Sequence, residues 1–254
     1  MNKQYILLTL VLVALLWPVC AFAEQAKPSL AQAKATYEQN DRDLNKAYKS
    51  VKAELPEHTF AELKAKQRGW IHYRDFFCDE VIRRDSPRLA KADLTKEVVY
   101  WQRMSGITHE RTAILRAILS AHQGKEKPLT GRWIDGYGGY LNIVEQGDKI
   151  AFEIDVVRGP TYHLGNLAGV AERNGQLIRF NDGGEDDGKG YVRKPAWVTF
   201  IHRANHIELI TAGAQIYCGA RAYFDNDYYR VGDLTEKARK QVLKQAGGEP
   251  DEAR

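Results

Sequence analysis

The chain contains 254 residues, carries a formal net charge of +4 at pH 7, and is 44% hydrophobic and 28% charged. This excess of positive charge is too small to indicate nucleic-acid binding, and no basic run is interleaved with aromatic residues as a stacking groove requires. The apolar content is ordinary and suffices to bury one large core or two small ones.

Residues 1–23 have the pattern of a secretory signal peptide. After a basic start, residues 5–19 form a nearly unbroken apolar run, and residues 21–23 (AFA) form a small-x-small cleavage site. We expect cleavage after Ala23 and a periplasmic or secreted protein that meets the membrane only through this export signal. An uncleaved anchor is the alternative, but it requires about 20 apolar residues, and this run is shorter and is interrupted by Pro18.

Residues 29–55 predict a first helix. Ser29 is a suitable N-cap, and one face carries apolar residues at helical spacing. Pro56 ends this helix because proline disfavours the helical conformation in the residue before it. A second helix is expected to start at the Thr-x-x-Glu capping box of residues 59–62 and to continue to about Arg84.

One face of the second helix mixes polar and aromatic side chains. Its members are Gln67, Trp70, Arg74 and Phe77. Helical spacing places the amide, the guanidinium and the rings on the same side, and both polar groups need hydrogen-bond partners. We expect Arg74 and Gln67 to form a polar bridge to Asn45 or Asp41 of the first helix. The aromatic residues Trp70, Tyr73 and Phe77 are expected in the core.

A third apolar helical surface follows, with Ser86 and Pro87 as its N-cap and first helical position. Gly106 leaves open whether this surface belongs to one helix or to two. Glu110 and Arg111 are interpreted as solvated helix charges.

These helices carry a family resemblance. The pattern Leu-Asn-x-x-Tyr, followed by Leu-Lys-x-x-Gln-Arg-x-Trp-Ile-x-Tyr-Arg-Asp-x-x-Cys, resembles the N-terminal domain of the LprI-type lysozyme inhibitor family. The matching positions are Leu44, Asn45, Tyr48, Leu63, Lys64, Gln67, Arg68, Trp70, Ile71, Tyr73, Arg74, Asp75 and Cys78. Arg111 and Leu115 look like the family's closing helix, so the resemblance covers roughly residues 30–122. It implies a helical domain in an exported protein.

The sequence period changes after residues 123–130, a polar segment with one proline that predicts a linker. Beyond it, Ile150, Phe152, Ile154 and Val156 occupy every second position, as in a strand with one buried face. Turn signals such as Asn174-Gly175 recur at about ten-residue spacing, which predicts an antiparallel barrel or sandwich of about seven or eight strands.

The expected fold class is therefore α+β, in two parts. A helical hairpin or bundle over residues 24–122 precedes a separate antiparallel β-barrel or sandwich over residues 131–231, with residues 123–130 as the linker. The first part has more basic than acidic residues, whereas the second has slightly more acidic ones and most of the glycines. Residues 232–254 form a charged tail that is expected to be at best a short helix.

Two cysteines remain after the export signal, and they lie one in each part. A disulfide between Cys78 and Cys218 is possible in an oxidising compartment and would stabilise the fold by about 4–5 kcal/mol. The alternative is two buried thiols, since unpaired cysteine is among the most buried residue types. The sequence leaves both alternatives open.

Catalytic and metal-binding constellations are not evident. No serine lies in a Gly-x-Ser-x-Gly elbow, and Ala113 stands where a zinc-helix motif beginning at His109 needs its second histidine. The carboxylate pair of a glycosidase would have to come from Asp225 and Asp227 or from an acidic loop, and neither lies in apolar sequence that would raise a carboxyl pKa. We expect no catalytic residue, no cofactor and no metal.

The acidic loop of residues 181–188 suggests a different use. Its candidate partner-binding residues are Asp182, Glu185, Asp186 and Asp187, to which the nearby turn adds His163. Muramidases of the lysozyme type are often strongly basic, so acidic residues on a β scaffold would be steered to them. The β part also looks loosely like small β-barrel lysozyme inhibitors. The leading hypothesis is a protein inhibitor of such a muramidase. The alternatives are a structural or ligand-binding periplasmic module and, least favoured, an enzyme acting on envelope glycan.

Overall fold

The structure, a computed structural model, describes residues 27–125, 128–175 and 177–247. The expected export signal lies outside these residues. The described part begins with three long helices, α1 (Leu30–Glu54), α2 (Glu57–Asp85) and α3 (Val98–His122), with a 3₁₀ helix, η1 (Lys91–Lys96), between the last two. Within the described ranges, no helix combines the length and the apolar character needed to cross a bilayer.

The beginning of the first helix is as predicted, and that of the second is not. The Ser29 hydroxyl accepts from the Gln32 N–H, and the Gln32 side chain accepts from the Ser29 N–H, so α1 has a complete capping box. The capping box expected at residues 59–62 is wrong, because α2 already begins at Glu57 with Pro56 in the N-cap position. Thr59 lies inside the first turn and contacts His58 instead.

The third helix begins later than predicted and is continuous. Ser86 is the C-cap of α2, where its N–H donates to Ile82 O, rather than the start of a new helix. The chain then turns through η1, in which Leu94 is buried, before α3 begins at Val98. Gly106 does not interrupt α3.

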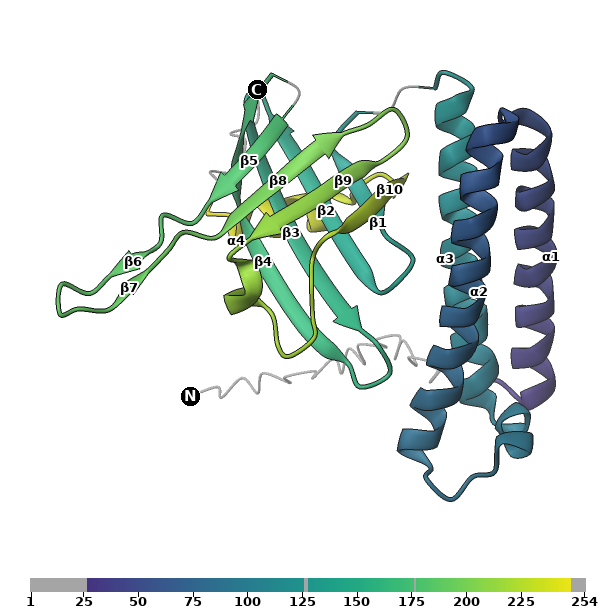
Figure 1. Cartoon of the computed structure of the whole chain (residues 1–254). Helices are drawn as coiled ribbons and strands as arrows, with labels where there is room; N and C mark the ends of the chain where they lie inside the picture. Colours follow the sequence, from purple (N-terminus) through teal and green to yellow (C-terminus); the bar gives the residue numbers. More distant parts are fainter. Residues whose placement is uncertain (1–26, 126–127, 176, 248–254) are drawn as a thin grey trace, which may run out of the picture.

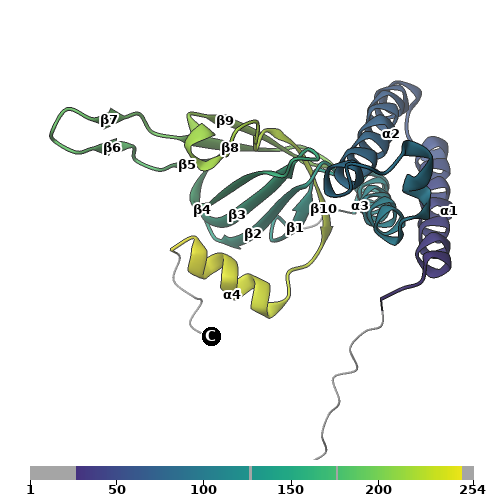
Figure 2. The same cartoon turned by 90° about the horizontal axis from the view of Figure 1, so that it is seen from below.

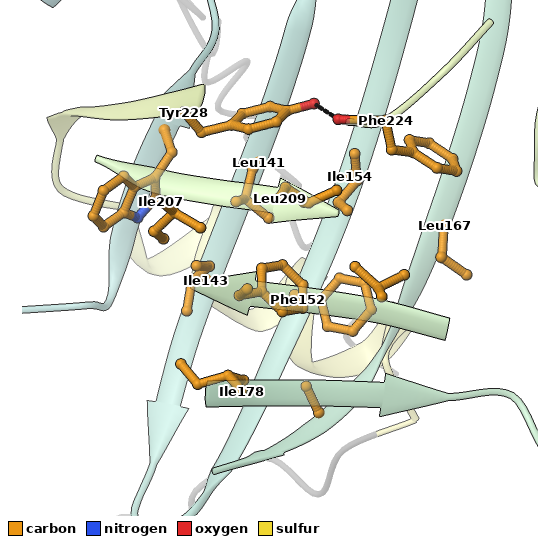
Figure 3. Packing of buried hydrophobic residues seen from close by; sticks show 14 of the residues in the cluster. Leu141, Ile143, Phe152, Ile154, Leu167, Ile178, Ile207, Leu209, Phe224 and Tyr228 are labelled. Atoms are coloured by element: carbon orange, nitrogen blue, oxygen red, sulfur yellow. Dashed lines mark hydrogen bonds between the residues drawn. The ribbon is translucent and has the colours of Figure 1, made fainter. Parts of the chain in front are cut away.

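The second part is a closed antiparallel barrel, in agreement with the predicted α+β class. Its eight strands are β1 (Gly131–Ile134), β2 (Gly139–Gln146), β3 (Lys149–Arg158), β4 (His163–Asn174), β5 (Leu177–Asn181), β8 (Trp197–His202), β9 (Ile207–Ala212) and β10 (Asn226–Gly232). They pair in the order β1-β10-β9-β8-β5-β4-β3-β2. Inward-pointing residues such as Leu141, Phe152 and Leu209 fill the interior (Figure 3).

Two short elements lie on the barrel. The 3₁₀ helix η2 (Ala214–Tyr217) follows β9, and the helix α4 (Glu236–Gln245) follows β10 and covers the outside of β2 and β3 (Figure 2). Val242 and Leu243 of α4 are buried against Val144 and Ala151. The expected tail is therefore in part a docked helix, and residues 248–254 lie outside the described residues.

The helices pack against the outside of the barrel beside β1 and β10 (Figure 1). An apolar cluster joins them, in which Trp70 and Ile114 of the helices pack with Ile134 and Tyr229 of the barrel. Polar contacts add to it: Lys66 Nζ lies 2.7 Å from Asp227 Oδ2, and the Tyr73 hydroxyl donates to Tyr137 O at 3.3 Å. The helices and the barrel thus share an apolar core. The division of the chain into two domains at a linker of residues 123–130 remains a prediction.

The two cysteines belong to different clusters. Cys78 is buried with Phe77, Val81 and Met104 between the helices, whereas Cys218 packs at the edge of the barrel interior. Both are free thiols in the structure. Of the two alternatives that the sequence left open, this arrangement favours separate thiols over an inter-domain bridge.

Candidate functional site: a projecting hairpin

The acidic loop forms an arm that leaves the barrel between β5 and β8. Two short strands, β6 (Glu185–Asp186) and β7 (Val192–Arg193), pair in antiparallel register along it. Both views show this arm extending away from the barrel on the side opposite to α1–α3 (Figures 1 and 2). Here "the arm" means residues 182–196.

Asp182 anchors the base of the arm. Its Oδ1 accepts from the N–H groups of Gly184 at 2.9 Å and Ala196 at 2.8 Å, and its Oδ2 accepts from Arg193 Nη1 and the Tyr217 hydroxyl, both at 2.7 Å. Only 6% of the Asp182 side chain is exposed. Burial alone would raise its pKa, but these hydrogen bonds outweigh burial and lower the pKa to about 2. Asp182 is therefore a structural residue rather than a contact residue.

Gly184 is required beside this anchor. Its φ of +72° is disfavoured for other residues, and a Cβ there would lie 2.6 Å from Arg193 O. The two strands of the arm can therefore approach closely only with glycine at this position.

Replacing Asp182 with asparagine is expected to destabilise the protein at neutral pH by about 2 kcal/mol, because charge-assisted hydrogen bonds to Arg193 and Tyr217 are lost. The folded-state pKa lies below the usual value, so this stabilisation is present above about pH 4 and disappears as the pH falls through about 2. Urea unfolding of parent and variant between pH 7 and pH 2 measures it. A difference that stays constant over this range contradicts the assignment.

The outer part of the arm presents charged and apolar side chains together. Glu185, Asp186 and Asp187 are exposed, and Tyr191 and Val192 are 54% and 68% exposed. The carboxylates are partly engaged in local turns: Asp186 Oδ1 accepts from Gly188 N, and Asp187 Oδ1 accepts from the N–H groups of Lys189 and Tyr191. These bonds hold the turn in shape while the side chains face solvent.

The arm is less acidic than the sequence of its first half indicates. Its acidic residues are Asp182, Glu185, Asp186 and Asp187, and its basic residues are Lys189, Arg193 and Lys194. Arg193 is bound to Asp182, and its Nε lies 3.9 Å from Glu185 Oε2. The outer part of the arm is therefore a mixed surface that exposes three carboxylates, a lysine, an aromatic ring and a valine.

The family-motif residues lie on α1 and α2, on the side of the barrel opposite to the arm (Figure 1), and some of them, including Trp70, are buried in the cluster shared with the barrel. The expected bridge from Arg74 and Gln67 to Asn45 or Asp41 is wrong. Gln67 Oε1 accepts from Arg111 Nε of α3 at 2.7 Å, in a buried position.

Arg74 and Asn45 have local partners instead. Arg74 pairs with Asp75 at 2.8 Å and lies 5.3 Å from the centroid of the Trp70 ring. Asn45 donates to Asp41 within α1. The expected core positions hold for Trp70 and Phe77, which are buried, and Tyr73 is partly buried. The bridging partner is thus the third helix, not the first.

This buried arrangement of glutamine, tryptophan and arginine from two helices is the part of the chain that is similar to known proteins. Residues 20–115 match the model of the family Lysozyme inhibitor LprI. The match includes α1, α2 and most of α3, and it ends before the barrel and the arm. No curated protein and no solved structure matches the chain.

His163 is not part of the arm. It begins β4, where its Nε2 lies 2.8 Å from Thr161 Oγ1, on the hairpin that contacts α2 of the LprI-like region. Arg84 of α2 donates to Pro160 O in the same hairpin. The structure therefore places all four loop carboxylates on the arm, with Asp182 at its base and the other three in its outer part, and separates His163 from them.

The other carboxylates singled out in the sequence have structural partners. Asp225 accepts from the N–H and hydroxyl of Thr211, and Asp227 pairs with Lys66 and lies 3.4 Å from His206 Nε2. Across the described residues, no three histidine, cysteine or acidic side chains converge as a metal site would require. These residues do not form a carboxylate pair across an open cleft.

Sequence reasoning missed the buried polar residues at the junction. Glu110 and Arg111, interpreted as solvated, are partly and fully buried: Glu110 accepts from the Tyr140 hydroxyl at 2.7 Å, and Arg111 is 4% exposed. Asp135 and Arg158 form a buried ion pair in the barrel. Only Asp135 carries a local signal, since an aspartate followed by a glycine-rich turn is typical of a side chain that caps the turn.

Proposed function

We propose that the protein is an exported inhibitor of a lysozyme-type muramidase and that it binds the enzyme through the arm, without catalysis of its own. The LprI match over the helices supports the class of activity, because the matched family is described as lysozyme inhibitors. The arm lies outside the matched residues. Its assignment therefore rests on geometry.

The observation that carries the assignment is the combination of an exposed end with a fixed base. Asp182 ties both strands of the arm to Tyr217 on the barrel, so the end is presented in a defined position. A preorganised segment loses less conformational entropy on binding than a flexible loop does. Its width of two strands suits insertion into an enzyme cleft.

The chemistry of the end suits a basic, sugar-binding target. Glu185, Asp186 and Asp187 provide negative charge for steering toward a positively charged enzyme, which increases the association rate at low salt. Tyr191 and Val192 provide the apolar anchor that hot spots of protein interfaces need. The LprI-like helices, packed on the opposite side of the barrel, would leave the arm free to enter the cleft.

A turbidity assay of muramidase activity tests the proposal. We expect the protein, at tenfold excess, to slow lysis by at least one lysozyme-type enzyme. The triple change Glu185→Gln, Asp186→Asn and Asp187→Asn should weaken inhibition about tenfold or more at low salt, because steering charges are lost while the amide oxygens still accept the turn hydrogen bonds. Tyr191→Ala should weaken it by a similar factor at all salt concentrations.

A matched control changes the same number of charges elsewhere. Glu38, Glu54 and Glu62 are exposed on α1 and α2, and their replacement with glutamine should leave inhibition unchanged. Failure of the parent protein to slow any of several muramidases would reject the proposed function. Full inhibition by the triple variant and by Tyr191→Ala would instead reject the arm and point to the LprI-like helices.

A further inference from the structure

A second site lies at the junction of helices and barrel. A cavity of about 340 Å³ opens there between α2, α3 and the turns that follow β1 and β3. This volume is at the lower end for small-molecule sites, which occur preferentially between structural units. The arm is not involved, so the site is independent of the proposed inhibition.

One wall of the cavity is a single face of α3. Arg103, Gly106, Ile107 and Glu110 line it, and they follow one another at the spacing of one helix face. The two charged residues mark its ends, and seven residues of helix separate them by about 10.5 Å. Gly106 between them has no heavy atom within 4 Å of a built Cβ, so the middle of this wall is bare.

The end at Arg103 has an unmet hydrogen-bond donor. Its Nε is buried and finds no acceptor among the described residues. Its guanidinium lies 5.7 Å from the centroid of the Tyr162 ring, which also carries Arg84 at 4.3 Å. A buried donor without a partner is rare in proteins, and the residue that carries it is one of those that line the cavity.

The end at Glu110 provides hydrogen-bond acceptors instead of donors. Its carboxyl group accepts from the Tyr140 hydroxyl at 2.7 Å. Burial raises the pKa of Glu110, and the hydrogen bond from Tyr140 opposes that rise. Because the Tyr140 hydrogen is used in this bond, the Glu110–Tyr140 pair offers acceptor oxygens to the hydroxyl groups of a ligand.

The remaining walls are aromatic, and one of them is strained. Tyr73 and Phe77 of α2 line the cavity, as does Tyr162, whose φ of 54° is uncommon for a residue with a side chain. Such backbone strain persists where surrounding structure enforces it and is concentrated at binding sites. The Tyr162 ring lies 6.4 Å from the Phe77 ring, and both residues line the cavity.

We propose that this cavity binds a disaccharide-sized carbohydrate with a carbonyl or carboxylate acceptor at one end. The acceptor would pair with the Arg103 guanidinium, sugar hydroxyl groups would donate to the remaining lone pairs of Glu110 and Tyr140, and the apolar ring faces would pack on the aromatic walls. The helix rise of about 10.5 Å between the two positions suits a ligand longer than one sugar ring. A purely cationic ligand is disfavoured because two guanidinium groups lie at Tyr162.

Calorimetric titration of the purified protein with N,N′-diacetylchitobiose tests this proposal. Cellobiose has the same length but lacks the acetamido carbonyl groups, and it should bind about tenfold more weakly, the effect of one lost hydrogen bond to a charged group. Arg103→Gln should reduce the preference for the acetylated sugar. Equal affinity for both sugars, or no saturable binding of the acetylated one, overturns the proposal.

Two glycine variants form a matched pair. Tyr162 and Arg221 are the described non-glycine residues with positive φ, and glycine relieves the backbone at both. Tyr162→Gly removes an aromatic wall and should weaken binding about tenfold or more, whereas Arg221→Gly should bind normally. If Tyr162→Gly does not fold, Glu110→Gln provides the same test with the packing preserved. Unchanged binding in these cavity variants places the ligand elsewhere and refutes the site.

Discussion

Arg158→Ala is expected to lower the free energy of unfolding by about 3–5 kcal/mol, the largest effect of any single substitution considered for this protein. Arg158 and Asp135 are 4% and 0% exposed at their side chains and form a buried ion pair. Removing the guanidinium leaves a carboxylate in the barrel without its counterion. An uncompensated buried charge costs far more than an exposed one.

The pair is embedded in a network, which adds to the cost. Arg158 also donates to the carbonyl groups of Tyr137 and Tyr223, both at 3.0 Å. Asp135 Oδ1 accepts from the N–H groups of Tyr137 and Gly139, both at 2.8 Å. The network therefore joins the β1–β2 turn to β3 and to the segment before β10. Because Tyr137 O accepts from Tyr73 of α2, it also supports the contact between barrel and helices.

Urea unfolding of Arg158→Ala beside an exposed-pair control checks this prediction. Arg203 and Glu208 form an ion pair at 2.6 Å with half of the arginine side chain exposed, so Arg203→Ala should cost about 1 kcal/mol or less. The double variant Asp135→Ala with Arg158→Ala should lose less stability than the sum of the two single variants, since neither charge is then left alone. Equal small losses for Arg158→Ala and Arg203→Ala contradict a buried pair.

The elements of the fold could be predicted from sequence because each has a local cause. Ser29 and Pro56 mark the two ends of α1, and the alternation from Ile150 to Val156 is seen in β3, which is buried on both faces where α4 covers it. The errors in the helices are also local. The helix α2 begins after Pro56, three residues before the capping box predicted at Thr59. Ser86 is a residue type that favours N-caps, but here it is the C-cap of α2.

The partners of the buried polar groups could not be predicted in the same way. Helical spacing shows that Gln67 needs a partner, but it does not show which helix supplies it. Asn45 of the first helix and Arg111 of the third are both polar and could both bond to Gln67. Only the packing of the helices decides which of them is its partner. For the arm, sequence identified the carboxylates but not that Asp182 is a buried anchor, because that role depends on Ala196 at the other end of the arm and on Tyr217 of η2.

Gln67→Ala is expected to destabilise the protein by about 3 kcal/mol, through the loss of a hydrogen bond to a charged group and through the cavity that remains. The amide provides the acceptor for Arg111 Nε, and Arg111 Nη2 already lacks a partner among the described residues. No carboxylate in the described part of the chain forms an ion pair with Arg111. Its cation lies 5.7 Å from the centroid of the Trp70 ring, and burial lowers its pKa.

Burying the Arg111 cation lowers the stability of the protein. Replacing both Gln67 and Arg111 therefore tests how much this cation costs. Arg111→Met alone should cost less than Gln67→Ala, because it removes a poorly compensated charge but leaves the buried Gln67 Oε1 without its donor. Gln67→Leu with Arg111→Met should then be at least as stable as the parent protein. Thermal and urea unfolding measure both, with Arg74→Ala as the control.

The stability of Arg74→Ala distinguishes the Gln67–Arg111 contact from the bridge through Arg74 expected from sequence. Its side chain is 11% exposed and pairs with Asp75, which is 53% exposed, so its contacts with Asp75 and Trp70 are worth about 1 kcal/mol. If Arg74→Ala destabilises more than Gln67→Ala, the polar seam runs through Arg74 after all. We predict a larger loss of stability for Gln67→Ala than for Arg74→Ala, and this order would place the buried polar contact of the LprI-like helices between α2 and α3. In that case Arg111, rather than Arg74, supplies the buried polar contact that joins α2 to α3.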